Sequence, residues 1–362
     1  MVPASAGAQV PTRRLSAGRL GHPGHVDVET ALGELTTVAD DEAVVHAGSQ
    51  ARVYRELPPD SVVEIDGHTA RTLPRRGELL ARIATVNDVH FGETTAGHID
   101  GVDGFETYSV EPGEEPYPEF MNAGAVAEMA AVDPDLVVAK GDLTSNGTVE
   151  EYERFLSVYG GAFGDRLMHV RGNHESYHGL DRAAWPMQER SVPGATVALL
   201  DTSRDGRANG DLSAEQLDWL DELGSRADRP VLVLGHHPVW NPAEEERSSA
   251  TFGLVPEATE ALDEVFARRP SLLAYFAGHT HRNRVVRLPG SAKPFVVVAC
   301  VKDYPGTWAE YRVHEGAILQ VHRRISTPEA LSWTERTRHM FGGHYHLYAF
   351  GALEERCFAL DV

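Results

Sequence analysis

Short apolar runs alternate with longer amphipathic stretches from Leu79 to about Arg324 of this 362-residue chain. Apolar runs of strand length separated by stretches with helical spacing predict a βα alternation. The predicted strands end at Val86, Ala139, Val170, Leu200, Leu234 and Ala277. Capping-box spacing predicts one helix after Thr148, running to about Tyr159, and another after Ser213, and an amphipathic stretch predicts a third from Pro256 to Arg268. The pattern therefore predicts an α/β fold.

The residues before Leu79 have a different pattern. Residues 1–40 are rich in Ala, Gly, Pro, Ser and Thr, and they predict a mobile tail with a short helix near Val28 to Leu35. Residues 41–78 predict a β-rich leader, because turn signals separate short strands at 51–57, 61–65 and 69–73. Residues 79–325 then form the predicted main domain, and residues 326–362 form a C-terminal extension. The Gly- and Pro-rich insert from Gly92 to Phe120 predicts a long loop over the site.

Five polar motifs follow predicted strands, and none of them contains a thiol. Loops at the carboxyl ends of strands can converge on one site in an open α/β sheet. Two carboxylates, an amide and several imidazoles are the ligand set for two borderline or hard metal ions. In an extended chain residues i and i+2 point the same way, so the first and last motifs can each direct two side chains to one ion. The motifs are Asp88-Val89-His90, Gly141-Asp142, Gly172-Asn173-His174-Glu175, Gly235-His236-His237 and Gly278-His279-Thr280-His281.

Each motif taken alone is weak evidence. A Gly-Asp pair is usually a turn, and Asn-His after a glycine is more often a loop or a helix cap. Their occurrence in one order, each after a strand, makes a purely structural role improbable for the set. Glycines precede most of the candidate ligands, as a tight bend and a close backbone approach require.

With these motifs the chain resembles the calcineurin-like metallophosphoesterase superfamily from about Leu79 to Arg324. The pattern of that superfamily is Asp-x-His, Gly-Asp, Gly-Asn-His-Asp/Glu, Gly-His and Gly-His-x-His, and every element is present here. The stretches 86–92 and 141–144 are most similar to the bacterial class III cyclic-nucleotide phosphodiesterase branch. The resemblance implies a four-layer α/β/β/α sandwich, here preceded by the β-rich leader.

The resemblance also implies roles for individual residues. One ion would be bound by Asp88, His90 and His281, the other by Asn173, His236 and His279, and Asp142 would bridge both. His174 would stand beside the phosphate as a hydrogen-bond donor or general acid, so the implied catalytic residues are His174, Asp142 and Asn173. The implied reaction is the hydrolysis of phosphate esters by a bridging hydroxide, with a cyclic-nucleotide diester as the expected substrate. His237 is expected to be a packing or supporting residue.

Some alternatives stay open on the sequence alone. The residues after Asp142 are Leu143, Thr144 and Ser145, so the tyrosine of the purple acid phosphatases is missing, and two divalent ions of Mn, Fe or Zn are expected. A phosphomonoesterase would use the same core. A non-catalytic scaffold would be expected to lose ligands or the acid histidine, and a structural zinc site would favour cysteines. Arg282 and Arg284 either contact a phosphate oxygen or a ribose, or are simply solvated.

Charge and composition limit the partners. The chain has 33 basic and 54 acidic residues, a formal net charge of −21, which repels nucleic acid and anionic membranes. A small-molecule phosphate ester is therefore the expected partner, drawn by metal ions, with no nucleic-acid polymer and no membrane; a homodimer is left open. Cys300 and Cys357 are the only cysteines, and Cys300 closes an apolar run, which predicts a buried thiol. With neither a signal-peptide h-region nor an apolar run near 18 residues, a reducing cytoplasm is the expected compartment.

Overall fold

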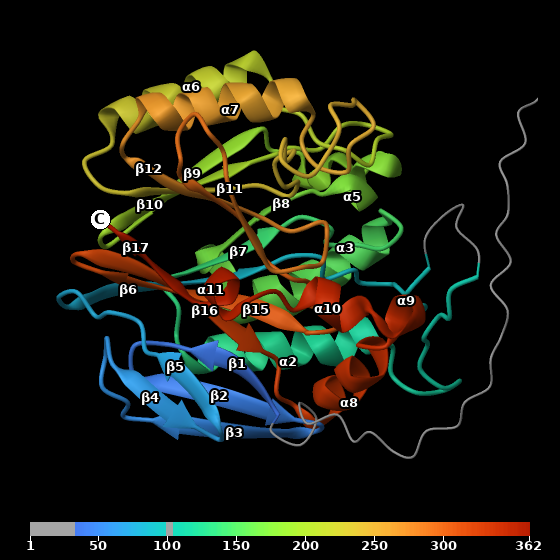
Figure 1. Cartoon of the computed structure of the whole chain (residues 1–362). Coiled ribbons are helices and arrows are strands. Elements are labelled where there is room, and N and C mark those ends of the chain that lie inside the picture. The colour runs from blue at the N-terminus through green and yellow to red at the C-terminus, as the bar shows by residue number, and fades with distance from the viewer. Residues whose placement is uncertain (1–32, 99–103) are drawn as a thin grey trace, which may run out of the picture.

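The computed structural model describes residues 33–98 and 104–362, and two six-stranded sheets lie face to face within them (Figure 1). One sheet has the strand order β17-β16-β15-β6-β7-β8, and the other has the order β13-β14-β12-β11-β10-β9. The bounds in the first are Phe358–Asp361, Ala317–Arg324, Thr307–His314, Leu79–Val86, Leu136–Lys140 and Leu167–Val170. In the second they are Arg284–Arg287, Pro294–Val297, Leu272–Ala277, Val231–Leu234, Ala195–Leu200 and Met187–Val192.

Each sheet combines parallel and antiparallel strands. Both edges of the β13–β9 sheet are antiparallel, whereas the other sheet is antiparallel from β17 to β6 and parallel from β6 to the β8 edge. Strands β6, β7 and β8 run parallel, as do β10, β11, β12 and β14. All six strands predicted from the apolar runs are present, and only β7 ends one residue later than predicted, at Lys140. Because the parallel strands share a direction within each sheet, their carboxyl ends lie together and can present loops to a common site.

Three apolar cores order the layers as helix, sheet, sheet, helix. Alternate residues of a strand face opposite sides, and Val138 of β7 packs against residues of the other sheet, while Val137 packs on the helical side. Helices α6 (Ala214–Arg226) and α7 (Pro256–Arg268) cover the outer face of the β10–β12 sheet. Helix α2 (Tyr117–Ala131) covers the other outer face. The predicted α/β fold class is confirmed.

The predicted helices are also present, with one change of geometry. Ser213 and Gln216 form the expected capping box of α6, and α7 has the predicted bounds. Helix α3 (Val149–Phe155) starts after the Thr148 cap, but Leu156–Gly160 continues it as a π-helical turn. The remaining helices are α4 (Gly161–Phe163), α5 (Asn173–Tyr177), α8 (Pro328–Thr337), α9 (Met340–Gly343), α10 (Tyr345–Ala349) and α11 (Leu353–Arg356).

The β-rich leader forms two small antiparallel sheets below the sandwich in Figure 1. They consist of β1 (Glu34–Val38), β2 (Glu42–Ala47) and β3 (Gln50–Arg55), and of β4 (Val62–Ile65) and β5 (His68–Arg71). The predicted tail and its short helix are wrong for residues 34–40, because Glu34–Val38 form β1, whose buried side chains pack on the Cys357 segment, and Ala39 and Asp40 are buried after it. Residues 1–32 of the predicted tail lie outside the described residues.

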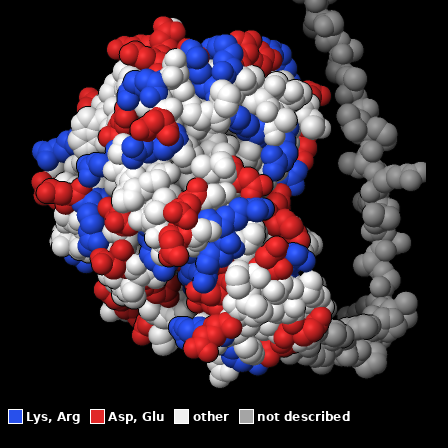
Figure 2. Space-filling view, turned by 90° about the vertical axis from the view of Figure 1, so that its left-hand side faces the viewer, with Lys and Arg blue, Asp and Glu red and all other residues white. Residues whose placement is uncertain are grey.

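The C-terminal residues complete the sheet that contains β6, β7 and β8. Strand β17 pairs with β16 at its edge, and Tyr345 from α10 joins the apolar core under α2. Both cysteines are free and buried, as predicted for Cys300. Within residues 33–98 and 104–362, no helix is long and apolar enough to cross a membrane. On the face shown in Figure 2, Lys and Arg side chains are interspersed with Asp and Glu.

Candidate metal centre

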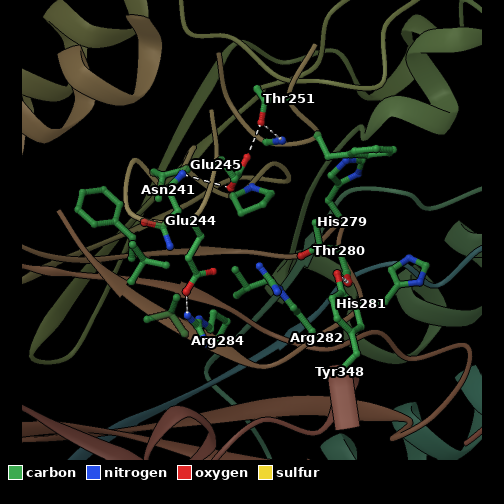
Figure 3. A pocket seen from close by; sticks show the side chains of 18 of the residues that line it. Asn241, Glu244, Glu245, Thr251, His279, Thr280, His281, Arg282, Arg284 and Tyr348 are labelled. Carbon is green, nitrogen blue, oxygen red and sulfur yellow. Dashed lines mark hydrogen bonds and ion pairs between the residues drawn. The ribbon is translucent and has the colours of Figure 1, made fainter. Parts of the chain in front are cut away.

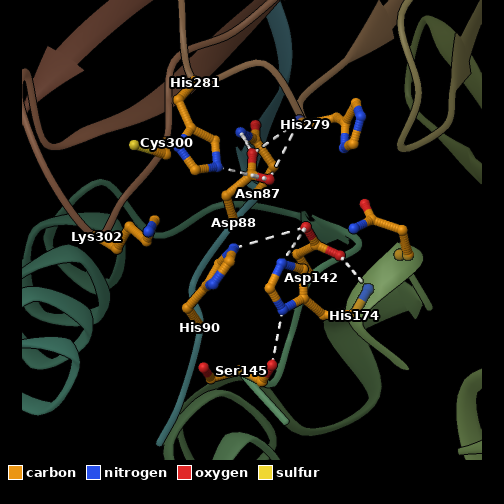
Figure 4. A network of polar contacts seen from close by, with 12 residues as sticks. Asn87, Asp88, His90, Asp142, Ser145, His174, His279, His281, Cys300 and Lys302 are labelled. Atoms are coloured by element: carbon orange, nitrogen blue, oxygen red, sulfur yellow. Dashed lines mark hydrogen bonds and ion pairs between the residues drawn. The ribbon is translucent and has the colours of Figure 1, made fainter. Parts of the chain in front are cut away.

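The loops that follow five parallel strands bring all seven predicted ligands to one place between the two sheets. Asp88 and His90 follow β6, Asp142 follows β7, and Asn173 begins α5 after β8. His236 follows β11 of the other sheet, and His279 and His281 follow β12. Figure 4 shows the Asp88, His90, Asp142 and His281 side chains gathered around one space.

The first predicted ion would lie among Asp88, His90 and His281. The nitrogen and oxygen atoms that these three side chains can offer lie within 4.8 Å of one another. His281 Nε2 is 3.4 Å from Asp88 Oδ1, and both side chains are at least largely buried. The three side chains that the resemblance assigns to the first ion therefore lie close together in the structure.

Asp142 lies between this group and the second one. Its Oδ2 is 3.6 Å from His90 Nε2 of the first group and 3.2 Å from His236 Nε2 of the second. His236 Nε2 is in turn 3.0 Å from Asn173 Oδ1, and the His279 ring centroid lies 5.1 Å from that of His236. A single carboxylate is thus placed to reach both groups.

Five of the seven predicted ligands have a left-handed backbone conformation. The structure describes eleven non-glycine residues with positive φ, and five of them are Asp88 (φ 52°), His90 (47°), Asp142 (49°), His279 (69°) and His281 (52°). An extended chain was expected to direct Asp88 with His90, and His279 with His281, and this expectation is wrong. The side chains converge by tight left-handed bends, which cost free energy and cluster at functional sites.

Glycines next to the ligands allow the close packing of these loops. A β-carbon at Gly172 would lie 2.2 Å from Asp142 Oδ1, and one at Gly141 would lie 2.7 Å from the His236 ring. Contacts this short do not occur for real side chains, so both positions require glycine. The sequence predicts glycine beside the ligands because the backbone must approach them closely, and this geometry agrees with that prediction.

Hydrogen bonds to the backbone fix the orientation of the rings. His236 Nδ1 lies 2.9 Å from the Lys140 carbonyl oxygen, and His174 Nδ1 lies 2.7 Å from that of Ser145. A carbonyl can only accept, so Nδ1 carries the proton in each ring and Nε2 faces the centre. Asn87 donates from Nδ2 to Asp88 Oδ2 at 2.5 Å. Such outer partners orient metal-binding side chains.

The carboxylates hold positive charge in this buried centre. Burial and the Lys302 ammonium lower the pKa of His90, but Glu93 and Asp142 outweigh them and raise it to about 10. Burial likewise lowers the pKa of His236, and Asp142 raises it to about 9. Protons on these rings balance the carboxylates, and a divalent cation competes with protons for the same lone pairs.

Buried imidazole nitrogens without a hydrogen-bond partner support the presence of metal ions. Among the described residues, His90 Nε2, His237 Nε2 and His279 Nε2 have no such partner. Burial lowers the pKa of His279 to about 3, so its ring is neutral and offers a lone pair. A buried polar atom without a partner is costly unless something binds it. Only nitrogen and oxygen donors face the centre from the seven residues, and this set fits a pair of divalent ions.

Three charged residues beside the centre were not singled out from the sequence. Glu93 Oε2 lies 3.1 Å from His90 Nδ1, and Lys302 Nζ lies 2.7 Å from Glu93 Oε1. Asp303 Oδ2 lies 3.9 Å from His281 Nδ1. The sequence offers only weak signals for these three residues. Glu93 comes three residues after the predicted ligand His90, and Lys302 and Asp303 follow an apolar run, as the five motifs do.

His237 and the two arginines of the last motif take different positions. His237 Nδ1 lies 2.8 Å from Thr202 Oγ1, and the ring is fully buried beside His236 and His279. Arg284 is paired with Glu244, whereas Arg282 stacks its guanidinium on the Tyr348 ring at 5.0 Å. Of the two, Arg282 is the one that lines the open side of the centre without a carboxylate partner among the described residues.

An α/β fold with imidazoles and carboxylates gathered at the carboxyl ends of strands from two sheets defines a metallophosphoesterase. The sequence model of the calcineurin-like phosphoesterase family matches residues 81–283, and the chain belongs to that family. It is a hydrolase that acts on phosphate esters, and the family uses divalent metal ions. The predicted family resemblance is confirmed.

Related proteins extend this comparison. The chain is 26% identical over 289 residues to the 3′,5′-cyclic adenosine monophosphate phosphodiesterase CpdA of Escherichia coli K12, covering 71% of this chain and 94% of that protein. It is 28% identical over 166 residues to the cAMP/cGMP dual specificity phosphodiesterase MT0825 of Mycobacterium tuberculosis, covering 41% and 49%. Among solved structures, a dimetal phosphatase from Danio rerio has a TM-score of 0.54 at 18% identity, covering 68% of this chain and 98% of that one. The structural likeness supports the fold.

Proposed function

We propose that this protein is a phosphodiesterase with a dinuclear metal centre and that cyclic nucleotides are its substrates. The observation that carries the proposal is the position of Asp142, whose Oδ2 lies within 3.6 Å of imidazoles from both ligand groups. The related proteins named above are cyclic-nucleotide phosphodiesterases, and this supports the choice of substrate class.

The ligand assignment follows the two groups. Asp88, His90 and His281 would hold one divalent ion, Asn173, His236 and His279 would hold the other, and Asp142 would hold both. When bound, such ions supply hydroxide at neutral pH and offset the charge of the phosphate in the transition state. The metals proposed are Mn, Fe or Zn.

His174 has a different role from its neighbour Asn173. Its Nε2 faces Asp142 Oδ2 at 4.0 Å, and the side chain is 31% exposed, unlike the nearly buried ligands. Burial lowers the pKa of His174, and Asp142 offsets this only in part. The role of acid therefore requires the doubly protonated ring, which the negative charge of a bound phosphate would favour, and Nε2 would then donate to the leaving oxygen.

Two other functions remain as alternatives. A phosphomonoesterase would use the same seven residues and the same acid. A non-catalytic interaction scaffold has no need for a complete ligand set or for a histidine free to donate a proton. The described residues retain both, and this supports an enzyme.

The proposal is tested by activity assays on the metal-reconstituted full chain. The substrates are bis-p-nitrophenyl phosphate, p-nitrophenyl phosphate, and 3′,5′- and 2′,3′-cyclic nucleotides. We expect hydrolysis of the diesters, with a higher kcat/KM for a cyclic nucleotide than for p-nitrophenyl phosphate. A higher kcat/KM for the monoester would make the protein a phosphomonoesterase, and no hydrolysis of any ester would contradict the proposed function.

The accessory regions have proposed roles as well. We propose that the leader, residues 41–78, stabilises the catalytic domain of residues 79–325, and that the C-terminal extension, residues 326–362, stabilises it and also supplies part of the wall of a cavity beside the candidate metal centre. Three statements about the whole protein stay predictions from the sequence: a cytoplasmic location, no nucleic-acid partner and no membrane partner. Whether the protein forms a homodimer stays open.

A further inference from the structure

A cavity of about 620 Å³ opens directly beside the metal centre. His279 and His281 form part of its wall, and the opposite wall comes from residues 241–253 and from the segment that contains Tyr348. Figure 3 shows the Arg282 side chain extending into this space from the segment that carries the two histidines. The volume is in the range of sites that bind most of a drug-sized molecule, so it can hold a group much larger than a phosphate.

Arg282 is the unsatisfied cation of this cavity. Its Nε is buried and has no hydrogen-bond partner among the described residues, and its guanidinium lies 5.0 Å from the centre of the Tyr348 ring. The neighbouring charges are already engaged. Glu244 pairs with Arg284, and Glu245 accepts hydrogen bonds from the Thr251 hydroxyl and from a backbone amide. A ligand in the cavity therefore meets a planar donor group that has no acceptor of its own.

Phe252 presents an aromatic face to the same cavity. Its side chain is 67% exposed, and its ring centroid lies 6.2 Å from that of His279, with 36° between the planes. The position of Phe252 is fixed by its neighbours, because the Leu254 amide donates to the Pro238 carbonyl at 2.7 Å. A β-carbon at Gly253 would lie 2.4 Å from that same carbonyl oxygen. A large apolar ring is thus held in solvent next to a predicted metal ligand.

Tyr348 lies on the other side of Arg282. It is 45% exposed, and its hydroxyl donates to the Thr280 carbonyl at 3.0 Å. This hydrogen bond ties α10 to the segment between His279 and His281. The Tyr348 ring therefore supports the guanidinium plane and leaves its remaining donors directed into the cavity.

We propose that this cavity binds the planar base of a nucleoside ester, with Phe252 as the stacking face and Arg282 as the donor to the acceptor edge of the base. The inference rests on the proposed function, because it places the phosphate at the metal centre. A base has a π-face for the aromatic ring and acceptor atoms that match the planar fork of a guanidinium. A quaternary ammonium group would also pack on aromatic rings, but the charge of Arg282 repels it.

The test compares two ligands that share a phosphate and a ribose. Binding of adenosine 5′-monophosphate and of ribose 5-phosphate is measured on the Mn²⁺-loaded full chain and on the variants Phe252→Ala, Phe252→Tyr, Arg282→Gln and Arg282→Lys. We expect Phe252→Ala to weaken binding of the nucleotide about 10-fold, as loss of one base–aromatic stack predicts, and binding of the sugar phosphate less than 2-fold. Phe252→Tyr should bind the nucleotide as the wild type does, and both Arg282 variants should lose affinity for the nucleotide selectively.

Matched controls separate this effect from general damage. Leu347→Ala removes an apolar side chain that is 70% exposed and lies next to Tyr348, and Arg287→Gln removes an exposed arginine outside the cavity. Both should bind the two ligands as the wild type does. Metal content is measured on every variant, because Arg282 is adjacent to the predicted ligand His281 and its substitution can disturb metal binding. If an Arg282 variant loses metal, the Phe252 variants still test the stacking face.

Three results would overturn the inference. Unchanged nucleotide binding in Phe252→Ala would exclude stacking. Equal losses for both ligands in the Arg282 variants would make Arg282 a phosphate-binding residue. Equal affinity of the wild type for nucleotide and sugar phosphate would exclude a base site altogether. These binding results are independent of turnover, so a wild type that binds the nucleotide selectively but hydrolyses no ester would contradict the proposed function and not the base site.

Discussion

At the scale of the residue, the proposed roles divide the side chains of this centre into seven metal ligands and one proton donor, His174. Seven side chains have donor atoms directed to a shared space, and most of them are almost fully buried. His174 is more exposed, and its Nδ1 is bound to the Ser145 carbonyl, so that only Nε2 is available. Substitutions at Asp142 and His174 should therefore have different consequences.

Asp142→Asn should abolish turnover and lower metal occupancy in both groups. The amide keeps the size of the side chain but removes the charge that would bind two ions, and the burial of the site makes that charge hard to replace. Elemental analysis and the bis-p-nitrophenyl phosphate assay measure the two effects. Asp165→Asn, an exposed carboxylate without an ion pair among the described residues, is the control. Normal metal content in Asp142→Asn would exclude the bridging role.

His174→Ala should keep its metal content and lose turnover by roughly 10²- to 10⁴-fold, the usual contribution of a positioned general acid. The loss should be larger for a cyclic nucleotide than for bis-p-nitrophenyl phosphate, because p-nitrophenolate leaves without protonation. The exposed His178, from the same short segment, is the matched control. Equal losses on both substrates would make His174 a residue that positions the phosphate, and loss of an ion would make it a ligand.

At the scale of the element, one buried arginine fastens the leader to the catalytic domain. Arg312 of β15 is only 6% exposed, and its guanidinium contacts Asp40, Asp41 and Glu42 at the start of β2, and Glu310 of its own strand. The opposing charges hold the pKa of Arg312 above its usual value despite burial. The leader is thus tied to the central sheet by ion pairs to a buried arginine.

Arg312→Gln should lower the free energy of unfolding by about 1.5–3 kcal/mol, the range for hydrogen bonds to charged groups, because Arg75, Arg82 and Arg323 still pair with the carboxylates that Arg312 contacts. Denaturant unfolding followed by circular dichroism measures the change. Arg71→Gln breaks the exposed pair between Arg71 and Asp60, both about 61% exposed, and should cost less than about 1 kcal/mol. Similar losses in the two variants would show that the Arg312 contacts do not stabilise the docked leader.

The elements also show which features could be predicted from the sequence. The inner parallel strands are mostly apolar, so the residue at which each strand ends could be predicted to within one residue. The motifs could then be placed in the loops that follow these strands. Strands β15 and β16 carry buried charges such as Glu310 and Arg312, which match neither an apolar run nor a simple alternation. Glu310 pairs with arginines of neighbouring strands and Arg312 pairs with the leader, and a local pattern contains neither contact. The roles of Glu93 and Asp303 likewise depend on contacts with side chains from other segments, although their positions after apolar strands were a weak signal.

At the scale of the whole molecule, the junction between leader and catalytic domain should be sensitive to acid. His46 of β2 is buried and contacts Thr36 Oγ1 and Ser326 Oγ at 2.8 and 3.0 Å. Burial lowers its pKa from 6.5 to about 3, and the Arg324 charge adds to this effect. The unfolded chain binds a proton near pH 6.5 that the folded chain binds only near pH 3. The stability that the neutral His46 contributes is therefore fully present above about pH 6.5 and is lost as the pH falls toward 3.

Between pH 6.5 and 5 this one histidine should cost about 2 kcal/mol of the free energy of unfolding, since each pH unit corresponds to about 1.4 kcal/mol. Denaturant unfolding at several pH values measures the slope. His46→Asn removes the titrating group and should flatten the slope by that amount, whereas His178→Asn, which changes an exposed ring, should not. A His46→Asn slope equal to that of the wild type would show that this residue does not control acid sensitivity.

The dinuclear assignment is tested most directly by the number of transition-metal ions per chain. Elemental analysis of the full-length protein, purified under metal-replete conditions and freed of loosely bound ions, gives this number. The geometry of Asp142 between two groups of ligands predicts about two ions per chain. A saturating content of one ion per chain, or of none, would contradict the two-metal centre.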